Sequence, residues 1–472
     1  MLTLIPYIVG VLAAIAVIIL PREKDLYVAI FFIPWVAFVI DFGASLQVPE
    51  FLSAILLLKY FVKGWLHPTY FMGGVFLLLF FGLAFFSAYL TMEYGPPVPE
   101  FAGGGTLRNG YGRVFTATLN ISLKFCLLFF LFSLRETLKV VNVLKVYVWS
   151  CLILAGLGLL QLIVFIGSGI DIFPIGSFVQ QEGRSGAINI QGQSFLRVSS
   201  FGGEPKGLGQ SLVAALAVVA LFGRQFNWSR QMWIIAVILL LTIITATVST
   251  SAFIMIVAIS GMIVVMAQKR IPFMNATLVK MFFAISLGFV SIYYGMVYYL
   301  DTQQAVIYTA AESYWDALKG RTIDRIKLDD TDSVIWESFV GDYYGLILGR
   351  GMGLVHHYAY LFIAPHQLYY MDGKLIPAKS GLSFYVGNAG LLGFMFMTFM
   401  SSTLTPSIKD SRIYEHPGKV KAIKQFQALC LGLWAAHLLR LYTFDITWVL
   451  FALASIAGYQ LHNEYRQQKF HL

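Results

Sequence analysis

Cationic and acidic side chains gather with glycines in the segment 197–206, which reads Arg-Val-Ser-Ser-Phe-Gly-Gly-Glu-Pro-Lys. A guanidinium such as that of Arg197 binds phosphate oxygens through two parallel hydrogen bonds. The paired glycines allow backbone to approach a ligand closely, and a helix start beside Lys206 favours an anion. The segment therefore predicts an anion site. The alternative is a solvated loop in which Arg197 pairs with Glu204 or with lipid headgroups.

A second set of basic residues lies in the segment 301–382, a long polar stretch rich in glycine and aromatic residues. The candidate anion ligands among them are Arg321, Arg325, Arg350 and Lys379. Aromatic faces suit sugar rings, although Trp and Tyr also gather at membrane interfaces. His366 lacks the spacing of a metal-ligand set, so we predict no metal site and treat it as a candidate general base. Arg440 either faces the same cavity or pairs with Asp445.

Membrane-spanning helices are the elements that must position these residues. Hydrophobic residues make up 58% of the 472 residues and charged residues 12%, whereas soluble domains carry about 25% charge. Uncharged windows such as 70–92 exceed the roughly 20 residues that a span requires. We predict an all-α polytopic protein with about twelve to fourteen crossings, which forms one integral membrane domain over residues 1–472. The predicted helices are 3–20, 26–42, 50–66, 70–91, 113–134, 141–167, 207–223, 231–248, 250–267, 275–299, 383–405, 425–440 and 444–461.

Lys and Arg lie mostly in short loops between these helices, which is the positive-inside pattern. The pattern accounts for the formal charge of +9 and removes the case for nucleic-acid binding. It places the basic loops in the cytoplasm and the segments 168–206 and 301–382 on the opposite side. The apolar stretch 2–20 lacks a basic leader and a cleavage site, so we expect a retained helix. The three cysteines fall in apolar runs and are expected to be packing residues.

Four features in this order resemble the superfamily of O-antigen ligases and polymerases, over roughly residues 140–405. The first is Arg197 with Gly-Gly-Glu-Pro before a helix, and the second is an uncharged helical hairpin at 234–268. The third is Gly320-Arg321, followed by a Gly-x-Gly-x-Gly run at 349–353. The fourth is Gly390 at the start of Gly-Leu-Leu-Gly.

The resemblance implies a glycosyltransferase C-type fold in the bacterial inner membrane, with 168–206 and 301–382 as periplasmic loops. It implies an undecaprenyl-pyrophosphate-linked oligosaccharide as donor, arginines that hold the pyrophosphate, and inverting, metal-independent transfer with no cofactor. A chain-length regulator of Wzz type is a further partner that it suggests. Ligases of this superfamily carry a His-Asn pair about eleven residues before the glycine that corresponds to Gly390. This chain has Lys379 and Ser380 there, which favours a polymerase of Wzy type.

We therefore expect a polymerase that transfers glycan from one lipid-linked unit to the non-reducing end of another. Arg197 and Arg321 would face one cavity and stabilise the leaving pyrophosphate, joined by Arg325, Arg350, Arg440, Lys206 and Lys379. Glu204 or His366 would act as the base. One alternative is a ligase that moves glycan to lipid A-core or to protein. The other is a transporter or flippase of lipid-linked sugars, for which charges lining a midplane cavity would be expected.

Overall fold

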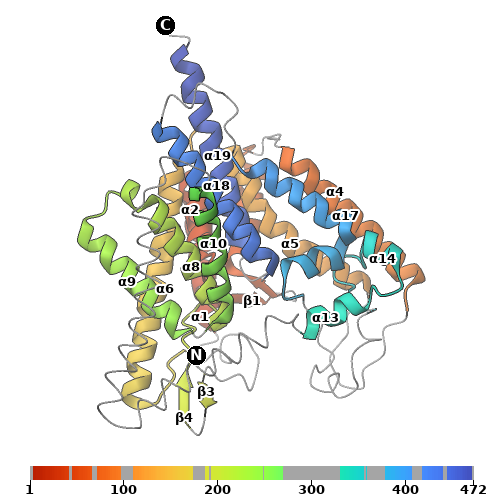
Figure 1. Cartoon of the computed structure of the whole chain (residues 1–472), viewed down its shortest axis with the longest axis horizontal. Helices are drawn as coiled ribbons and strands as arrows, with labels where there is room; N and C mark the ends of the chain where they lie inside the picture. The colour runs from red at the N-terminus through yellow and green to blue at the C-terminus, as the bar shows by residue number, and fades with distance from the viewer. Residues whose placement is uncertain are drawn as a thin grey trace.

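The computed structural model describes residues 4–41, 45–65, 72–96, 110–173, 187–190, 193–247, 249–268, 330–355, 358, 378–406, 417–439 and 444–469. These residues form a helical bundle with two short β-hairpins (Figure 1). The elements are α1 (Ile5–Ile19), α2 (Lys24–Phe32), β1 (Val39–Asp41), β2 (Ser45–Gln47), α3 (Val48–Val62), α4 (Met72–Tyr94), α5 (Gly110–Ser133), α6 (Val140–Ser168), β3 (Ala187–Ile190), β4 (Gln193–Leu196), α8 (Pro205–Phe222), η2 (Gly223–Phe226), α9 (Arg230–Ala246), α10 (Thr250–Gln268), α13 (Asp330–Glu337), α14 (Tyr343–Leu348), α17 (Gly381–Leu404), α18 (Pro417–Leu439) and α19 (Phe444–Lys469).

Within these ranges, five helices are long and apolar enough to cross a membrane, and the chain is a helical membrane protein. They are Met72–Tyr94, Val114–Ser133, Val140–Ser168, Pro205–Phe226 and Gly381–Leu404. Three shorter apolar helices accompany them. The predicted helix 425–440 begins earlier, at Pro417, and the predicted helix 444–461 continues to Lys469. Both extensions are polar, so a search for apolar windows does not detect them. The predicted helix 275–299 lies outside the described residues.

The predicted helix 26–42 is wrong over its second half, because α2 ends at Phe32. Ile33 still has helical φ and ψ, but Pro34 has no N–H to donate, so the helical hydrogen bonds do not continue. The chain then turns into β1, which pairs antiparallel with β2. Trp35 Nε1–H donates to Ser150 Oγ at 2.8 Å, and the Ala37 N–H donates to the Phe201 carbonyl at 3.1 Å. The turn is thereby attached to α6 and to the segment that follows β4.

Helix α3 forms although Lys59 lies within it. The Lys59 ammonium donates to the carbonyls of Val17 at 2.8 Å and Leu20 at 2.6 Å. It also forms an ion pair with Asp25 at 2.7 Å. Carbonyls at the end of a helix have no partner within that helix and attract cations. Lys59 therefore joins α3 to the end of α1, which explains how a lysine is tolerated in this helix.

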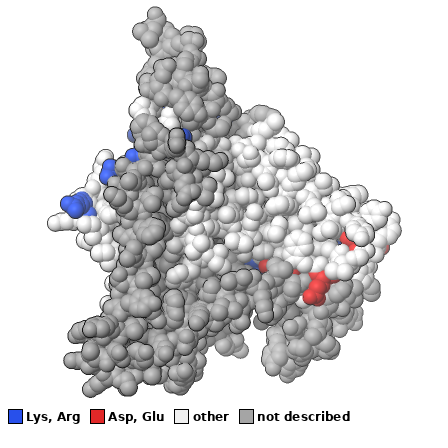
Figure 2. Space-filling view, viewed as in Figure 1, with Lys and Arg blue, Asp and Glu red and all other residues white. Residues whose placement is uncertain are grey.

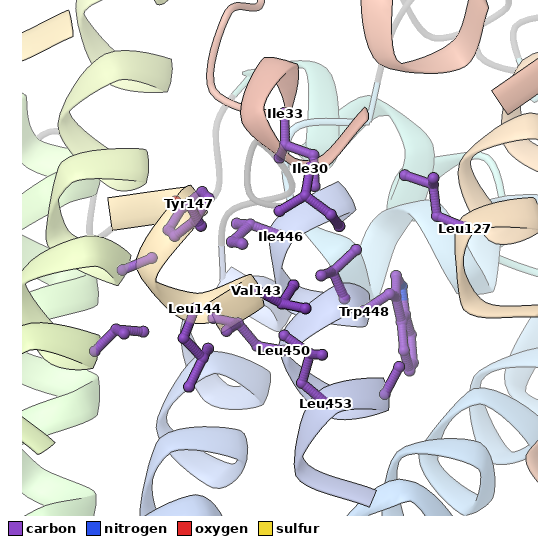
Figure 3. Close-up of a cluster of buried hydrophobic side chains, with 14 of the residues drawn as sticks. Ile30, Ile33, Leu127, Val143, Leu144, Tyr147, Ile446, Trp448, Leu450 and Leu453 are labelled. Carbon is purple, nitrogen blue, oxygen red and sulfur yellow. The ribbon is translucent and has the colours of Figure 1, made fainter. Parts of the chain in front are cut away.

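The core is formed where helices from distant parts of the sequence meet. Figure 3 shows Ile30 of α2 and Val143 of α6 near side chains of α19, among them Ile446 and Leu450. The Tyr147 hydroxyl on α6 donates to the Ser211 carbonyl of α8 at 2.9 Å. In the apolar stretch of α8, 89% of the residues are buried, whereas in the other long apolar helices the share of buried residues is 33–50%. Helix α8 is therefore the central helix of this bundle.

Several of the basic turns lie together at one end of the bundle. Arg22, after α1, donates to the Trp65 carbonyl at 3.3 Å and to Ser133 Oγ at 3.4 Å, which joins the ends of α3 and α5. Gln460 Nε2–H of α19 donates to the Arg135 carbonyl at 2.8 Å. Figure 2 shows Lys and Arg at the upper left, in the region of α9, and Asp and Glu at the lower right, in the region of α13 and α14. On the described part of this face, basic and acidic side chains thus lie apart.

Helix α17 is broken at Gly390, whose φ of 65° and ψ of −170° are not helical. A break in an apolar helix leaves backbone carbonyls without partners. Here the following glycine-rich segment supplies the donors. The Arg350 N–H donates to the Gly387 carbonyl at 2.8 Å, and the Gly351 N–H donates to the Asn388 carbonyl at 3.1 Å. The Gly-x-Gly-x-Gly run and Gly390 therefore form one backbone interlock, which holds α14 against α17.

We expect Gly351→Ala to destabilise the protein far more than Gly341→Ala. Both glycines have a left-handed φ, 92° and 79°, which costs an alanine about 1–2 kcal/mol. A Cβ at Gly351 would also overlap the backbone of Ala88 on α4, whereas a Cβ at Gly341 meets nothing within 4 Å. Overpacking adds roughly 1–3 kcal/mol. Thermal unfolding of both variants in detergent tests this, and equal losses of Tm would contradict the interlock.

Candidate functional site

The turn between β4 and α8 is held by backbone hydrogen bonds to two helices. The N–H groups of Ser199 and Ser200 donate to Gln161 Oε1 of α6, at 3.2 Å and 2.9 Å. The Val198 N–H donates to the Ala246 carbonyl, at the end of α9, at 3.1 Å. Ser200 has a φ of 45°, a conformation that surrounding structure must enforce in a residue other than glycine. The turn is therefore a preorganised element.

The two glycines of this turn serve packing rather than ligand approach, which corrects the expectation from the sequence. A Cβ at Gly202 would lie 2.7 Å from Leu208 Cβ, and a Cβ at Gly203 would lie 3.4 Å from Val36. Gly203 also has a φ of 80°, which favours glycine. The space beside each glycine, where a Cβ would lie, is thus bordered by neighbouring residues of the protein.

Three charged residues flank this turn at the start of α8. Arg197 is half-buried, and its Nε–H donates to the Thr247 carbonyl at 3.4 Å. Glu204 precedes the helix, and its carboxylate forms an ion pair with Lys206. Its side chain makes no capping hydrogen bond, while its carbonyl accepts the first helical N–H groups. The ammonium of Lys206 and the carboxylate of Glu204 thus lie at the start of α8, and the guanidinium of Arg197 lies at the end of α9. Such groups can bind an anion and accept a proton.

Buried polar atoms lie in and beside this turn. Ser199 Oγ, Ser200 Oγ and Gln210 Oε1 are buried and have no hydrogen-bond partner among the described residues. Unsatisfied buried polar atoms are rare in native proteins and often mark a site for a ligand or water. No local motif in the sequence marks these residues or Gln161 as functional. Two of them, Gln161 and Gln210, are visible in the sequence as glutamines within otherwise apolar helices.

Arg350 is buried, and other residues of the protein hold its guanidinium. It is 3% exposed, forms an ion pair with Asp342, and donates to the Ser338 carbonyl. Its guanidinium also lies over the rings of Phe339 at 4.9 Å and Tyr358 at 3.7 Å. Burial opposes ionisation of Asp342, but the Gly345 N–H and the Arg350 guanidinium outweigh it and lower the pKa of that carboxyl. We therefore remove Arg350 from the set of pyrophosphate ligands.

Lys379 lies directly before α17, close to the end of α18. Its backbone N–H donates to Asp332 Oδ1 of α13 at 2.9 Å, and Ser380 caps α17. A Cβ at Gly381 would lie 2.5 Å from the His437 carbonyl, so the start of α17 is against the last turn of α18. The remaining predicted site residues lie outside the described residues: Arg321, Arg325, His366 and Arg440. Within the described ranges, no group of three His, Cys, Asp or Glu side chains could hold a metal.

A second charged cluster lies inside the bundle. Lys124, in the middle of α5, forms ion pairs with Glu50 of α3 and Asp445 of α19, each at 3.1 Å. The three side chains are 19%, 5% and 12% exposed. Asp445 therefore has Lys124 as a partner, and Arg440, the alternative partner considered from the sequence, lies outside the described residues. The spacing of local motifs gave no signal for this cluster, because its members come from three distant helices.

We expect Lys124→Met to lower the free energy of unfolding by about 3–5 kcal/mol, because two buried carboxylates would lose their countercharge. Combining it with Glu50→Gln and Asp445→Asn should restore most of this loss. Lys139→Met, at an exposed lysine, is the matched control and should have little effect. Unfolding in detergent followed by intrinsic fluorescence tests the set. Equal stability of Lys124→Met and Lys139→Met would show that the cluster is not a structural contact.

A search of protein-family models and a search of curated proteins return no match. The geometry of the sites described above is therefore the basis for assigning a function.

Proposed function

We propose that this chain polymerises lipid-linked oligosaccharide repeat units at the periplasmic face of a bacterial inner membrane. The donor is a glycan on undecaprenyl pyrophosphate, and the acceptor is the non-reducing end of another lipid-linked unit. The helical bundle would be a glycosyltransferase C-type fold with twelve to fourteen crossings in all. The resemblance noted in the sequence and the charge asymmetry of the bundle support this proposal.

One observation supports it most directly: Arg197, Glu204 and Lys206 border a rigid turn at the start of a buried helix. Helix α8 has 18 residues, so its two ends lie about 27 Å apart. Its other end contacts a basic turn, where Lys145 donates to the Phe226 carbonyl at 3.1 Å. The candidate site and that turn are thus separated by the length of a membrane-spanning helix.

The chemistry requires a sugar transfer with a pyrophosphate leaving group. The acceptor hydroxyl attacks the anomeric carbon of the donor, and the bond from that carbon to the pyrophosphate oxygen breaks on the opposite side, which inverts the configuration. Glu204, or His366 in its place, accepts the hydroxyl proton. Arg197 and Lys206 stabilise the charge on the departing pyrophosphate, together with the further cations Arg321, Arg325, Lys379 and Arg440.

The glycan profile of a deletion strain tests the proposal. If the chain is the polymerase, its loss leaves surface lipid capped by single repeat units. Loss of all capped lipid would indicate a ligase that transfers glycan to lipid A-core or to protein. An unchanged profile would exclude both transferases.

A transporter or flippase of lipid-linked sugars is the second candidate. It is favoured by the break in α17 and by the buried cluster around Lys124, because transporters use broken helices and intramembrane charges at their substrate sites. Accumulation of unflipped lipid-linked units on the cytoplasmic side of the deletion strain would support it. The rigid turn at Arg197 would then have no catalytic role.

We expect cysteines introduced at Asp330 and Lys63 to differ in their accessibility. Asp330 begins α13, in the predicted periplasmic loop, and Lys63 is exposed in a predicted cytoplasmic loop. An impermeant thiol reagent should label Asp330→Cys and Asp372→Cys in intact spheroplasts, and Lys63→Cys only after lysis. Two of the three native cysteines are buried and the third is half-buried, which keeps the background low. The inverse labelling would overturn the orientation and the donor site with it.

A further inference from the structure

A cavity lies at the end of the bundle far from Arg197, between the end of α8 and the start of α18. It has a volume of about 620 Å³ and is bordered by η2 and the first turn of α9. Its basic lining residues are Arg224, Arg230 and Lys421, and no aspartate or glutamate is among its described lining residues. None of the three cations forms an ion pair within the described part of the chain. Within the described part of the chain, the cavity therefore carries three formal positive charges that no carboxylate balances.

The ends of three helices also contribute to the electrostatic potential of the cavity. Helices α9 and α18 both begin at the cavity, and the amino ends of helices carry partial positive charge that favours anions. Helix α8 presents its carboxyl end there and contributes a smaller opposing charge. Because three full charges and two amino ends outweigh one carboxyl end, the cavity is complementary to an anion.

The rim of the cavity is aromatic and apolar. Trp228 and Trp233 line it, and Trp228 Nε1–H is buried without a hydrogen-bond partner among the described residues. Ile234 and Ile238 follow Arg230 at helical spacing on α9 and are 39% and 58% exposed. Residues four apart lie on one helix face. An exposed apolar strip therefore leads away from the cationic cavity along α9.

We propose that this cavity binds the phosphate headgroup of an anionic glycerophospholipid, whose acyl chains lie along the apolar strip of α9. Basic pockets between helices on the cytoplasmic side are suited to such headgroups, and tryptophan is typical of the membrane interface. A free phosphate ion would use the cations but not the apolar strip. The occupant is therefore a lipid, and the site is separate from the proposed polymerase site.

The experiment measures lipid binding to the purified full-length protein in detergent by native mass spectrometry. The probes are dioleoylphosphatidylglycerol and dioleoylphosphatidylcholine, which share acyl chains and differ in headgroup charge. The wild type should bind the anionic lipid about tenfold more tightly or better. Each cation near a headgroup contributes about fivefold in affinity. The combined variant Arg224→Ala, Arg230→Ala, Lys421→Ala should therefore bind it roughly a hundredfold more weakly.

The matched control removes three exposed lysines at helix ends outside the cavity: Lys24→Ala, Lys63→Ala and Lys139→Ala. It changes the net charge by the same amount and should retain binding. Equal loss in both triple variants would overturn the proposal, as would equal affinity for the two lipids. Displacement of the lipid by inorganic phosphate at the same concentration would overturn the lipid assignment.

Two milder variants keep the proposal testable if the triple variant does not fold. Lys421→Glu should weaken binding of the anionic lipid more than tenfold. Trp228→Phe keeps a ring but removes the unpartnered N–H, and should weaken binding about fivefold. Unchanged affinity in both would overturn the proposal. The readout is binding of lipid, so its outcome is independent of whether the chain is a polymerase.

Discussion

The Arg197→Ala variant is expected to insert into the membrane normally and to make almost no polymer. Removing one preorganised donor from a site that stabilises developing charge costs about a hundredfold to a thousandfold in rate. The Arg197 side chain is held by the Thr247 carbonyl, beside a turn anchored on Gln161. Truncation therefore removes charge from a site whose backbone is independently supported. Polymer length and yield, measured in a deletion strain carrying the variant, give the result.

Arg197→Lys distinguishes a bidentate role from a general need for charge. An ammonium is a point charge and does not reproduce the planar fork of a guanidinium. We expect it to rescue poorly. Arg135→Ala, at an arginine in a basic turn at the other end of the bundle, is the control and should leave polymer unchanged. Arg321→Ala is expected to match Arg197→Ala if both residues hold the pyrophosphate. Normal polymer from the Arg197→Ala strain would remove this residue from the site.

The Glu204→Gln variant is expected to lose activity by about a hundredfold while still binding the donor, because an amide has the shape of the carboxylate but does not accept a proton. The structure makes this substitution informative. The Glu204 side chain makes no capping hydrogen bond to α8, so the substitution removes no capping hydrogen bond. The ion pair with Lys206 is partly exposed, and such pairs contribute only about 0–1 kcal/mol.

Glu204→Ala completes the comparison between a base and a structural residue. If the carboxylate only orients its neighbours, Gln should retain activity and only Ala should fail. If it is the base, both substitutions should fail to a similar extent. Near-normal polymer from Glu204→Gln would transfer the base to His366, or show that transfer needs no dedicated base in this loop. In vitro transfer with purified lipid-linked units gives the rates.

Local sequence was sufficient to locate most of the helices. The predicted spans 70–91 and 113–134 correspond to Met72–Tyr94 and Gly110–Ser133, because hydropathy over about 20 consecutive residues decides whether a segment suits a bilayer. The candidate site at 197–206 was also visible, since its charged residues lie within ten positions of each other and next to a helix start. Such features depend on neighbours along the chain.

Only the tertiary structure decided which distant residues meet. Gln161 fixes the turn at Ser199 and Ser200, and Lys124 takes Asp445 as a partner, across separations of 38 to 321 residues. Arg350 carries the same guanidinium group as Arg197. Even so, the interlock at the break in α17 places it in a buried ion pair instead of an anion site. Composition shows that a side chain carries charge. Whether that charge is available to a ligand depends on the partner that packing brings to it.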